Sequence, residues 1–355
     1  MMKTNKLSWM IAFVLLALMF AGLYVLEQTL PPTTMLFTIL KKSVIYALIA
    51  VSMNLLNGFT GLFSLGQAGF MVVGAYTFAI LTIPVQHRAM VYQYYDGGIV
   101  QFALPAALGI LAAGAVAAVF AFLVGLPVLR LKSDYLAIAT LGFAEIIRAF
   151  IQYEGLGPLT NGSNLLRRFP TFTGIIPPFA IVAFCIFIIV MLIHSTYGRA
   201  LKAIRDDETA AEAMGINLFF HKQLSFVISS FFAGVAGALL AMYQGSIQAA
   251  SFKSSMTYEI LLIVVIGGMG SISGSILASF LFIASSEWWL RFLDNELFIG
   301  TFKVPLLRSG FRVVVFSVII MAVVLFYRRG IMGDREFNLR FLTRGRSKAK
   351  ERKNG

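Results

Sequence analysis

Long apolar runs separated by short polar segments divide this chain almost from end to end. We expect membrane-spanning helices at 9–26, 43–57, 66–83, 101–126, 135–151, 178–194, 223–243, 256–269, 274–292 and 311–327. Most of these runs approach the roughly 20 residues that cross a hydrocarbon core. No small-residue cleavage site follows the first run, so we interpret it as a retained span rather than a signal peptide. The stretch 256–292 also fits one span plus a re-entrant hairpin, because its first member is short.

Composition supports a protein embedded in lipid. Hydrophobic residues make up 59% of the 355 positions and charged residues only 13%. A soluble domain of this length needs a more polar surface than that. The sequence therefore predicts an all-α, polytopic integral membrane protein with about ten transmembrane helices.

The positive charge of the chain has a defined distribution. If both termini are cytoplasmic, the inside segments carry 18 of the 29 lysines and arginines, as the positive-inside rule expects. Ten of these lie between Arg328 and Lys353. We therefore expect a transmembrane domain at 1–333 with a cytoplasmic loop at 195–222, followed by a basic cytoplasmic tail at 334–355. The tail suits a topology anchor in contact with anionic lipid, so the net charge of +13 does not indicate nucleic acid.

Charged residues near the apolar runs bear on where the spans begin. Lys41 and Lys42 would be costly at mid-membrane. We therefore place 33–40 as an interfacial outer segment and begin the second span after the two lysines. Glu145 and Arg148 are the only strongly ionisable pair that we place within a span, near its outer end, and their i, i+3 spacing lets them pair.

Several kinds of chemistry lack the residues they need. No Gly-Lys dipeptide occurs, so the chain has no phosphate-binding P-loop. The histidines His87, His194 and His221 lie far apart and indicate no metal site, and the single Cys185 excludes a disulfide framework. There is no nucleophile motif and no chain of membrane carboxylates. We expect no enzyme activity, no cofactor or metal on this chain, and no proton coupling.

Two glycine-interrupted apolar segments, 54–76 and 263–280, hint at an internal repeat. In the expected topology both enter from outside, turn near the cytoplasmic face and return. Broken helices in matching halves indicate a transport pathway, because they expose backbone groups to an internal cavity. The alternative is close helix packing, with polar side chains that only tie helices together. The positions that we assign to a polar translocation path are Asn54, Asn57, Gly61, Ser64, Gly66, Gln67, Gly69, Thr140, Asn161, Asn164, Gly267, Gly268 and Gly270.

The segment GRALKAIRDDETAAEAMGI, at 198–216, places a polar, alanine-rich stretch between two apolar runs. We expect a pair of short helices, with Asp206 or Asp207 as the N-cap of the second and Gly215 as its stop. Small alanines let another surface approach the backbone, so we interpret the pair as a docking element rather than a solvated loop. The apolar positions that recur at helical spacing, and predict a modest stripe, are Ile204, Ala211 and Met214.

Five stretches of this chain resemble one family. The segment 198–216 resembles the coupling-helix loop of ABC-type importer permeases, and more narrowly that of LivM-type members of the branched-chain amino acid permease family. Four further stretches are similar to motifs of the same family, in the same order: NLLNGFTGLFSLGQAGFMVVGAY at 54–76, LRLKSDYLAIATLGFAEIIR at 129–148, YEILLIVVIGGMGSISGSILAS at 258–279 and YRRGIMG at 327–333. Asn161 and Leu165 stand in the outer loop where the family usually has glycines, which bears on the geometry of that loop, and Ser275 stands where proline is usual.

The resemblance implies that 1–333 is a transmembrane permease domain of the bacterial inner membrane. It also implies ABC ATPase subunits that use ATP and Mg, a second permease subunit of the LivH type, and a periplasmic binding protein that delivers leucine, isoleucine or valine. A permease for urea or short-chain amides remains an alternative within the wider family, and an ion-coupled secondary carrier is a weaker one. The residues expected at the contact with the ATPase are Arg205, Asp206, Asp207, Glu208, Ala210, Ala211, Glu212, Ala213 and Gly215.

Overall fold

The structure is a computed structural model that describes residues 6–31, 34–131, 133–289, 298–299, 302–303, 315, 317–318, 321 and 330–333. The described part of the chain is mostly helical, as the apolar pattern predicts. Its α-helices are α1 (Lys6–Thr29), α2 (Met35–Asn54), α3 (Gln67–Thr82), α4 (Val85–Val91), α5 (Ala106–Val128), α6 (Ser133–Gln152), α7 (Gly157–Thr160), α8 (Ile176–His194), α9 (Thr196–Asp206), α10 (Glu208–Ala213), α11 (Leu218–Gln244), α12 (Ser254–Gly267) and α13 (Ile272–Ala284).

Short elements complete these helices. A π-helix, Leu55–Phe59, continues α2, and a second, Ser285–Trp289, continues α13. Two 3₁₀ turns lie at Glu154–Leu156 and Ala249–Ser251. The all-α expectation misses two short antiparallel strand pairs, which are β1 (Leu166–Arg167) with β2 (Ser246–Ile247) and β3 (Phe298–Ile299) with β4 (Phe302–Lys303).

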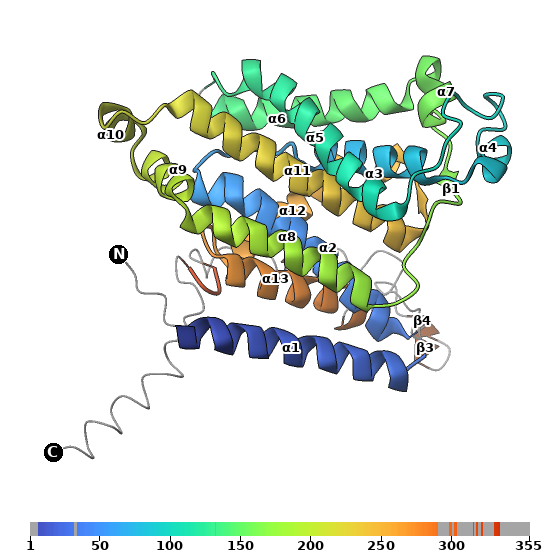
Figure 1. The fold of residues 1–355 in the computed structure, drawn as a ribbon, viewed down its shortest axis with the longest axis horizontal. Coiled ribbons are helices and arrows are strands. Elements are labelled where there is room, and N and C mark those ends of the chain that lie inside the picture. The colour runs from blue at the N-terminus through green and yellow to red at the C-terminus, as the bar shows by residue number, and fades with distance from the viewer. Residues whose placement is uncertain are drawn as a thin grey trace.

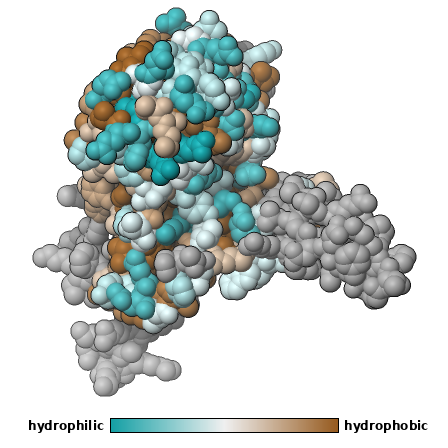
Figure 2. Space-filling view, turned by 90° about the vertical axis from the view of Figure 1, so that its right-hand side faces the viewer, coloured by the Kyte–Doolittle hydropathy of each residue, from teal (hydrophilic) through white to brown (hydrophobic). Residues whose placement is uncertain are grey.

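Five helical segments of the described chain are long and apolar enough to cross a membrane: Met35–Phe59, Ala106–Val128, Tyr135–Gln152, Ile176–His194 and Leu218–Gln244. Most long helices run along the long axis of the molecule, with α9 and α10 at one end and α4, α7 and β1 at the other (Figure 1). Figure 2 looks onto the second end, where hydrophilic residues gather. This arrangement is that of a multi-pass membrane protein.

The expected last span and the tail are not tested by these helices. The ends of the chain, the tail at 334–355 and most of the span at 311–327 lie outside the described residues. The count of ten spans and the cytoplasmic placement of both termini therefore stay predictions.

Helix α11 forms the centre of the packing. It packs against α5, α3 and α2, while α2 packs in turn against α13, α12 and α8. A Cβ added at Gly74 of α3 would collide with the backbone of Gly234 on α11, and one added at Gly234 would meet Ala113 and Ala117 of α5. Lipid is as apolar as a protein core, so close contact between small residues holds such helices together.

Two predicted span limits are wrong. Helix α2 begins at Met35 and runs through Lys41 and Lys42, where we expected an interfacial segment at 33–40. No proline or glycine interrupts it there, and Lys42 finds an anionic partner inside the protein, as described below. Helix α5 begins at Ala106 rather than 101, because Pro105 disfavours helix in the residue before it.

The stretch 256–292 forms a hairpin of two short helices, α12 and α13, joined by a turn at 268–271. Fourteen helical residues reach only about 21 Å at 1.5 Å per residue, less than a hydrocarbon core. The re-entrant alternative is therefore closer to the structure than two full spans. The expected final part of the second member, beyond Trp289, lies outside the described residues.

The outer loop accommodates its departures from the family. Asn161 adopts a left-handed backbone with φ of 63°, which asparagine tolerates better than most residues. Leu165 does not have a positive φ.

The Tyr92 hydroxyl donates to the Leu159 carbonyl at 3.0 Å, and burial raises the pKa of Tyr92 to about 12, so the hydroxyl stays protonated at neutral pH.

Candidate functional site

The first glycine-interrupted segment forms a turn at the end of the molecule where α9 lies. The chain leaves α2 through the π-helix Leu55–Phe59 and re-enters α3 at Gln67. Asn57 closes this turn, because its Oδ1 accepts from the Ser64 amide at 3.2 Å and its Nδ2 donates to the Ser64 carbonyl at 3.3 Å. Thr140 of α6 braces the turn from the side, since its Oγ1 accepts from the Leu65 amide at 2.9 Å.

Asn54 joins this turn to the second glycine-interrupted segment. Its Nδ2 donates to the Ser271 carbonyl at 2.9 Å and to Ser275 Oγ at 2.8 Å, and its Oδ1 accepts from the Gly270 amide at 2.8 Å. The Asn54 side chain is fully buried. The Asn54 side chain thus satisfies the Gly270 amide, which the break between α12 and α13 leaves without a helical partner, and adds a second link to the start of α13.

The second turn depends on backbone conformations that favour glycine. Gly268 has a φ of 110° and Gly270 one of 91°. The short segment 330–333 closes over this turn, with the Ile331 amide donating to the Ile266 carbonyl at 2.7 Å and the Met332 amide to the Gly267 carbonyl at 3.2 Å. We use the term turn junction for the two turns, 55–66 and 268–271, together with Asn54.

The polar segment at 198–216 forms the expected pair of short helices, α9 and α10, at one end of the molecule (Figure 1). Asp207 is the N-cap of α10, as one of the two predicted aspartates, and its Oδ1 accepts from the Ala210 amide at 3.0 Å. Gly215 follows the helix with a φ of 83°, as its predicted role as the stop requires.

The predicted apolar stripe on this helix pair is correct at two of its three positions. Ile204 and Ala211 are buried at 1% and 3% exposure, but Met214 is 83% exposed. Met214 lies at the C-cap of α10, beyond the last helical turn, so helical spacing does not place it on the buried face. Ile204 and Ala211 therefore mark the buried side of the helix pair, and Met214 marks its exposed side. The predicted contact residues on the exposed side are Arg205, Asp206, Asp207, Glu208, Ala210, Glu212, Ala213 and Gly215, whereas Ala211 faces inward.

Arg205 connects the helix pair to the turn junction. Its Nη1 donates to the Gly58 carbonyl at 3.2 Å, and its guanidinium also pairs with Asp206 at 3.0 Å. Gly61 lies directly beneath it, with a φ of 77°, and a Cβ added there would be 3.2 Å from the Arg205 Cα. The ammonium of Lys202 lies 5.5 Å from the centre of the Phe59 ring. The helix pair thus contacts the first turn at its tip.

The structure places the predicted path positions in two regions. Most of them surround the turn junction, where Gly66 and Gly69 let α3 approach Thr140 and Ala144 of α6. Gln67 donates to Ser229 of α11 at 2.9 Å, while its buried amide oxygen has no hydrogen-bond partner among the described residues. Asn161 and Asn164 lie at the opposite end of the molecule, beside α7 and β1, which we expect to be the outer end. The predicted path residues at or beside the junction are Asn54, Asn57, Gly61, Ser64, Gly66, Gln67, Gly69, Thr140, Gly267, Gly268 and Gly270.

One expectation about charge is wrong. Glu145 and Arg148 do pair, at 2.6 Å, but they are not the only ionisable pair in the helices. Lys42 Nζ lies 2.5 Å from Glu287 Oε1, across a sequence separation that no local pattern reveals. The signal available in the sequence was the presence of lone charged residues inside apolar runs, since such residues need a partner. The expected span limits leave Lys42 outside the membrane, so the sequence pattern gives Glu287 no partner.

Comparison with known proteins adds independent information. A sequence model of the family described as branched-chain amino acid transport system / permease component matches residues 35–327. The high-affinity branched-chain amino acid transport system permease protein LivM of Salmonella typhimurium is 34% identical over 279 residues, which cover 69% of this chain and 61% of that protein. LivM of Escherichia coli gives the same identity and coverage. The Escherichia coli permease protein LivH is 25% identical over 269 residues, covering 71% of this chain and 83% of LivH.

This chain therefore spans 61% of the length of the two LivM proteins that it matches. No solved structure matches it.

Replacing Asn54 with leucine is expected to destabilise the turn junction by about 1–3 kcal/mol, because it leaves the Gly270 amide without its partner and removes the hydrogen bonds to Ser271 and Ser275. The matched control is Asn164→Ala, which removes only one hydrogen bond, at 3.2 Å, from a partly exposed site. Thermal unfolding in detergent can be followed by labelling of the buried single thiol, Cys185, with a thiol-reactive dye. Equal unfolding midpoints for Asn54→Leu and Asn164→Ala would contradict the role of Asn54.

Proposed function

Because this chain belongs to the family of permease components of branched-chain amino acid transport systems, we propose that it is a permease subunit of an ATP-driven ABC importer in the bacterial inner membrane. Its cargo is leucine, isoleucine or valine, because its LivM and LivH relatives are branched-chain amino acid permease proteins. The proposed partners are ABC ATPase subunits, a second permease subunit of the LivH type and a periplasmic binding protein. The ATP and Mg are used by the ATPase, and this chain supplies the path.

The hydrogen bond from Arg205 to the Gly58 carbonyl is the structural observation that most supports this proposal. A helix pair with exposed alanines and an exposed Met214 offers a surface for the ATPase on one side. On its other side it touches the turn that breaks the path between α2 and α3. A rigid-body displacement of α9 would therefore move the first turn and, through Asn54, the second turn as well.

The turn junction suits a zwitterionic cargo without binding it tightly. Amino acids lose the hydration of two charges in hydrocarbon, and broken helices replace that water with backbone amides and carbonyls. Polar side chains at the junction are already hydrogen-bonded to the protein, so they hold the turns in place. The buried, unpartnered amide oxygen of Gln67 is the group there most suited to a polar solute or water.

The outer end fits delivery by a binding protein. A cavity of about 420 Å³ opens there, lined in part by Arg167, Arg168 and Gln93. Arg168 holds a left-handed backbone with φ of 70°, which is uncommon for a long side chain and is typical of functional sites. Arg167 and Arg168 are positively charged, so this rim can bind an acidic surface of the binding protein.

The experiment that tests the function is uptake by the whole complex in proteoliposomes. This chain, its partner permease and the ATPase are expected to accumulate leucine only when ATP is inside and the binding protein is outside. Urea in place of leucine serves as the control for the alternative substrate. Uptake that persists without the binding protein, or without ATP, would remove the importer assignment.

Docking at the helix pair can be tested by site-specific crosslinking. A Met214→Cys variant in a Cys185→Ala background is expected to crosslink to the ATPase, because Met214 is 83% exposed beside the proposed contact alanines. The matched control is Leu165→Cys, an exposed position at the outer end. Crosslinking in intact cells from the control position but not from position 214 would argue against docking here.

Arg205→Ala is expected to uncouple the two activities. The variant should keep ATP hydrolysis but lower uptake about tenfold, since losing a charged hydrogen bond of about 1.5–3 kcal/mol weakens the link to the first turn. Arg199→Ala, on the same helix and exposed, is the matched control. Measuring ATPase and uptake in the same proteoliposomes separates this result from loss of assembly, which would lower both.

A further inference from the structure

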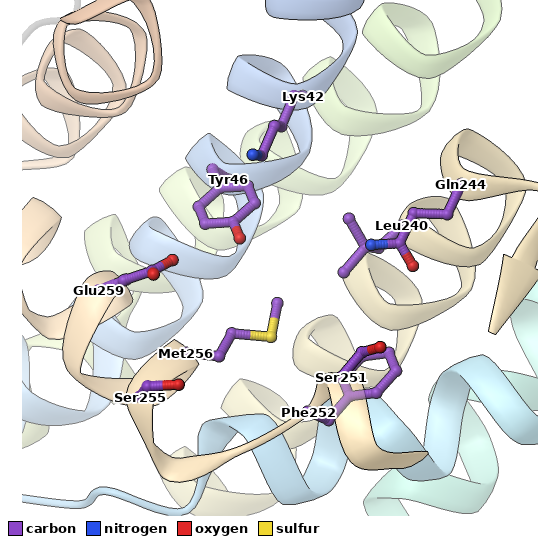
Figure 3. Close-up of a pocket in the computed structure, with 9 residues that line it drawn as sticks. All are labelled: Lys42, Tyr46, Leu240, Gln244, Ser251, Phe252, Ser255, Met256 and Glu259. Atoms are coloured by element: carbon purple, nitrogen blue, oxygen red, sulfur yellow. The ribbon is translucent and has the colours of Figure 1, made fainter. Parts of the chain in front are cut away.

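A small cavity lies between α2, α11 and α12, on the side of the turn junction toward the outer end. Its volume is about 150 Å³, well below the roughly 300–1,000 Å³ typical of sites for drug-sized ligands. Figure 3 shows Lys42 and Tyr46 on α2, Leu240 and Gln244 on α11, and Met256 and Glu259 on α12 around one space. The cavity is therefore of a size for a solute as small as a free amino acid.

The cavity wall presents both signs of charge. The Lys42 ammonium projects from α2, 5.8 Å from the centre of the Tyr46 ring. The Glu259 carboxylate points from α12 toward Tyr46 (Figure 3) and makes no hydrogen bond or ion pair with any described residue. Glu259 is an exposed residue at the cavity wall, so its carboxylate is accessible to a positively charged group of a solute.

The rest of the wall supplies the other contacts that an aliphatic amino acid needs. Leu240 and Met256 provide apolar surface, while Gln244 and Ser255 provide polar groups on either side of it. The Lys42 ammonium already has a carboxylate partner, because it lies 2.5 Å from Glu287 Oε1. A ligand carboxylate can replace Glu287 as the partner of Lys42, and Glu287 pairs with Lys42 again when the ligand leaves.

We propose that this cavity, which we call the Lys42–Glu259 cavity, is a transient binding site for an α-amino acid zwitterion on its way through the permease. Glu259 binds the ammonium, Lys42 binds the carboxylate in exchange with Glu287, and Leu240 and Met256 contact the aliphatic side chain. This inference rests on the proposed function and names the chemistry by which its path recognises cargo. The exchange of partners at Lys42 keeps binding weak enough for release.

The position of the cavity along α2 supports this assignment. Lys42 and Asn54 are twelve residues apart on one continuous helix, which is about 18 Å at 1.5 Å per residue. Helix α12 carries Glu259 in its first half and leads into the second turn at its C-terminal end. The cavity and the turn junction thus lie in series on the same two helices. A solute that leaves the cavity toward α9 meets the junction next.

The first test measures transport by the complete complex in proteoliposomes. Glu259→Gln and Lys42→Gln are each expected to lower maximal leucine uptake about tenfold, the effect of losing one charged contact. Lys41→Gln is the matched control, because this neighbouring lysine lines a separate small space with Glu27 and is expected to transport normally. The binding protein sets the apparent affinity, so the loss should appear in the maximal rate.

The second test detects whether the cavity is occupied by a ligand. It does not depend on transport, and it changes no charged residue. A Ser255→Cys variant in a Cys185→Ala background places a thiol at the cavity wall, where Ser255 is exposed. Millimolar leucine is expected to slow maleimide labelling of this thiol in the purified complex. The analogue 4-methylpentanoate lacks the ammonium and 3-methylbutylamine lacks the carboxylate, so neither should protect as leucine does. Labelling of Met214→Cys, far from the cavity, should not respond to any of them.

The outcomes separate this inference from the proposed function. Leucine uptake by the unchanged complex, together with normal uptake by Glu259→Gln and no protection of Ser255→Cys, would overturn the cavity assignment and leave the importer standing. Equal protection by either single-charge analogue would overturn the zwitterion as the ligand. Protection by leucine in a complex that shows no uptake would support the cavity and contradict the importer.

Discussion

The structure depends on one constraint: helices that break inside a membrane must find partners for their free backbone groups within the protein. Asn54 meets this constraint for the hairpin of α12 and α13, with three hydrogen bonds of 2.8–2.9 Å from a fully buried side chain. Asn57 and Thr140 do the same for the turn between α2 and α3. Side-chain amides and hydroxyls are therefore the groups that permit irregular backbone here, and irregular backbone is what a polar solute can use.

The five stretches that resemble the permease family meet around this constraint. They bring Asn54, Thr140, Arg205, Ser271 and Ile331 into contact with one or other of the two turns. Ser275, which stands where the family usually has proline, is part of the same network. Its hydroxyl accepts from Asn54 and donates to the Ser271 carbonyl at 3.0 Å. A proline side chain can do neither, so this departure adds a link between the two segments instead of weakening the fold.

Local features of this chain could be predicted from its sequence, and long-range contacts could not. Apolar runs predict most of the helices. The residue types at Asp207 and Gly215 predict the cap and the stop of α10, because each of these features depends on neighbouring residues. The partners of Asn54 lie 214 to 221 positions away, so no periodicity indicates them. The ion pair of Lys42 with Glu287 is hidden for the same reason. Helical spacing also placed Met214 on the buried side of α10, where the helix had already ended.

In the proposed importer, the order of these features along α2 and the π-helix that continues it would let a small external movement act on a solute. Lys42 lines the cavity toward the outer end, Asn54 holds the junction, and Gly58 contacts Arg205 at the opposite end. Buried, fully paired networks do not deform gradually, because each broken hydrogen bond leaves an unpartnered group in a low-dielectric interior. A displacement of α9 must therefore either move both turns together or exchange one set of partners for another. Both responses are discrete, which is the behaviour that alternating access requires of a permease.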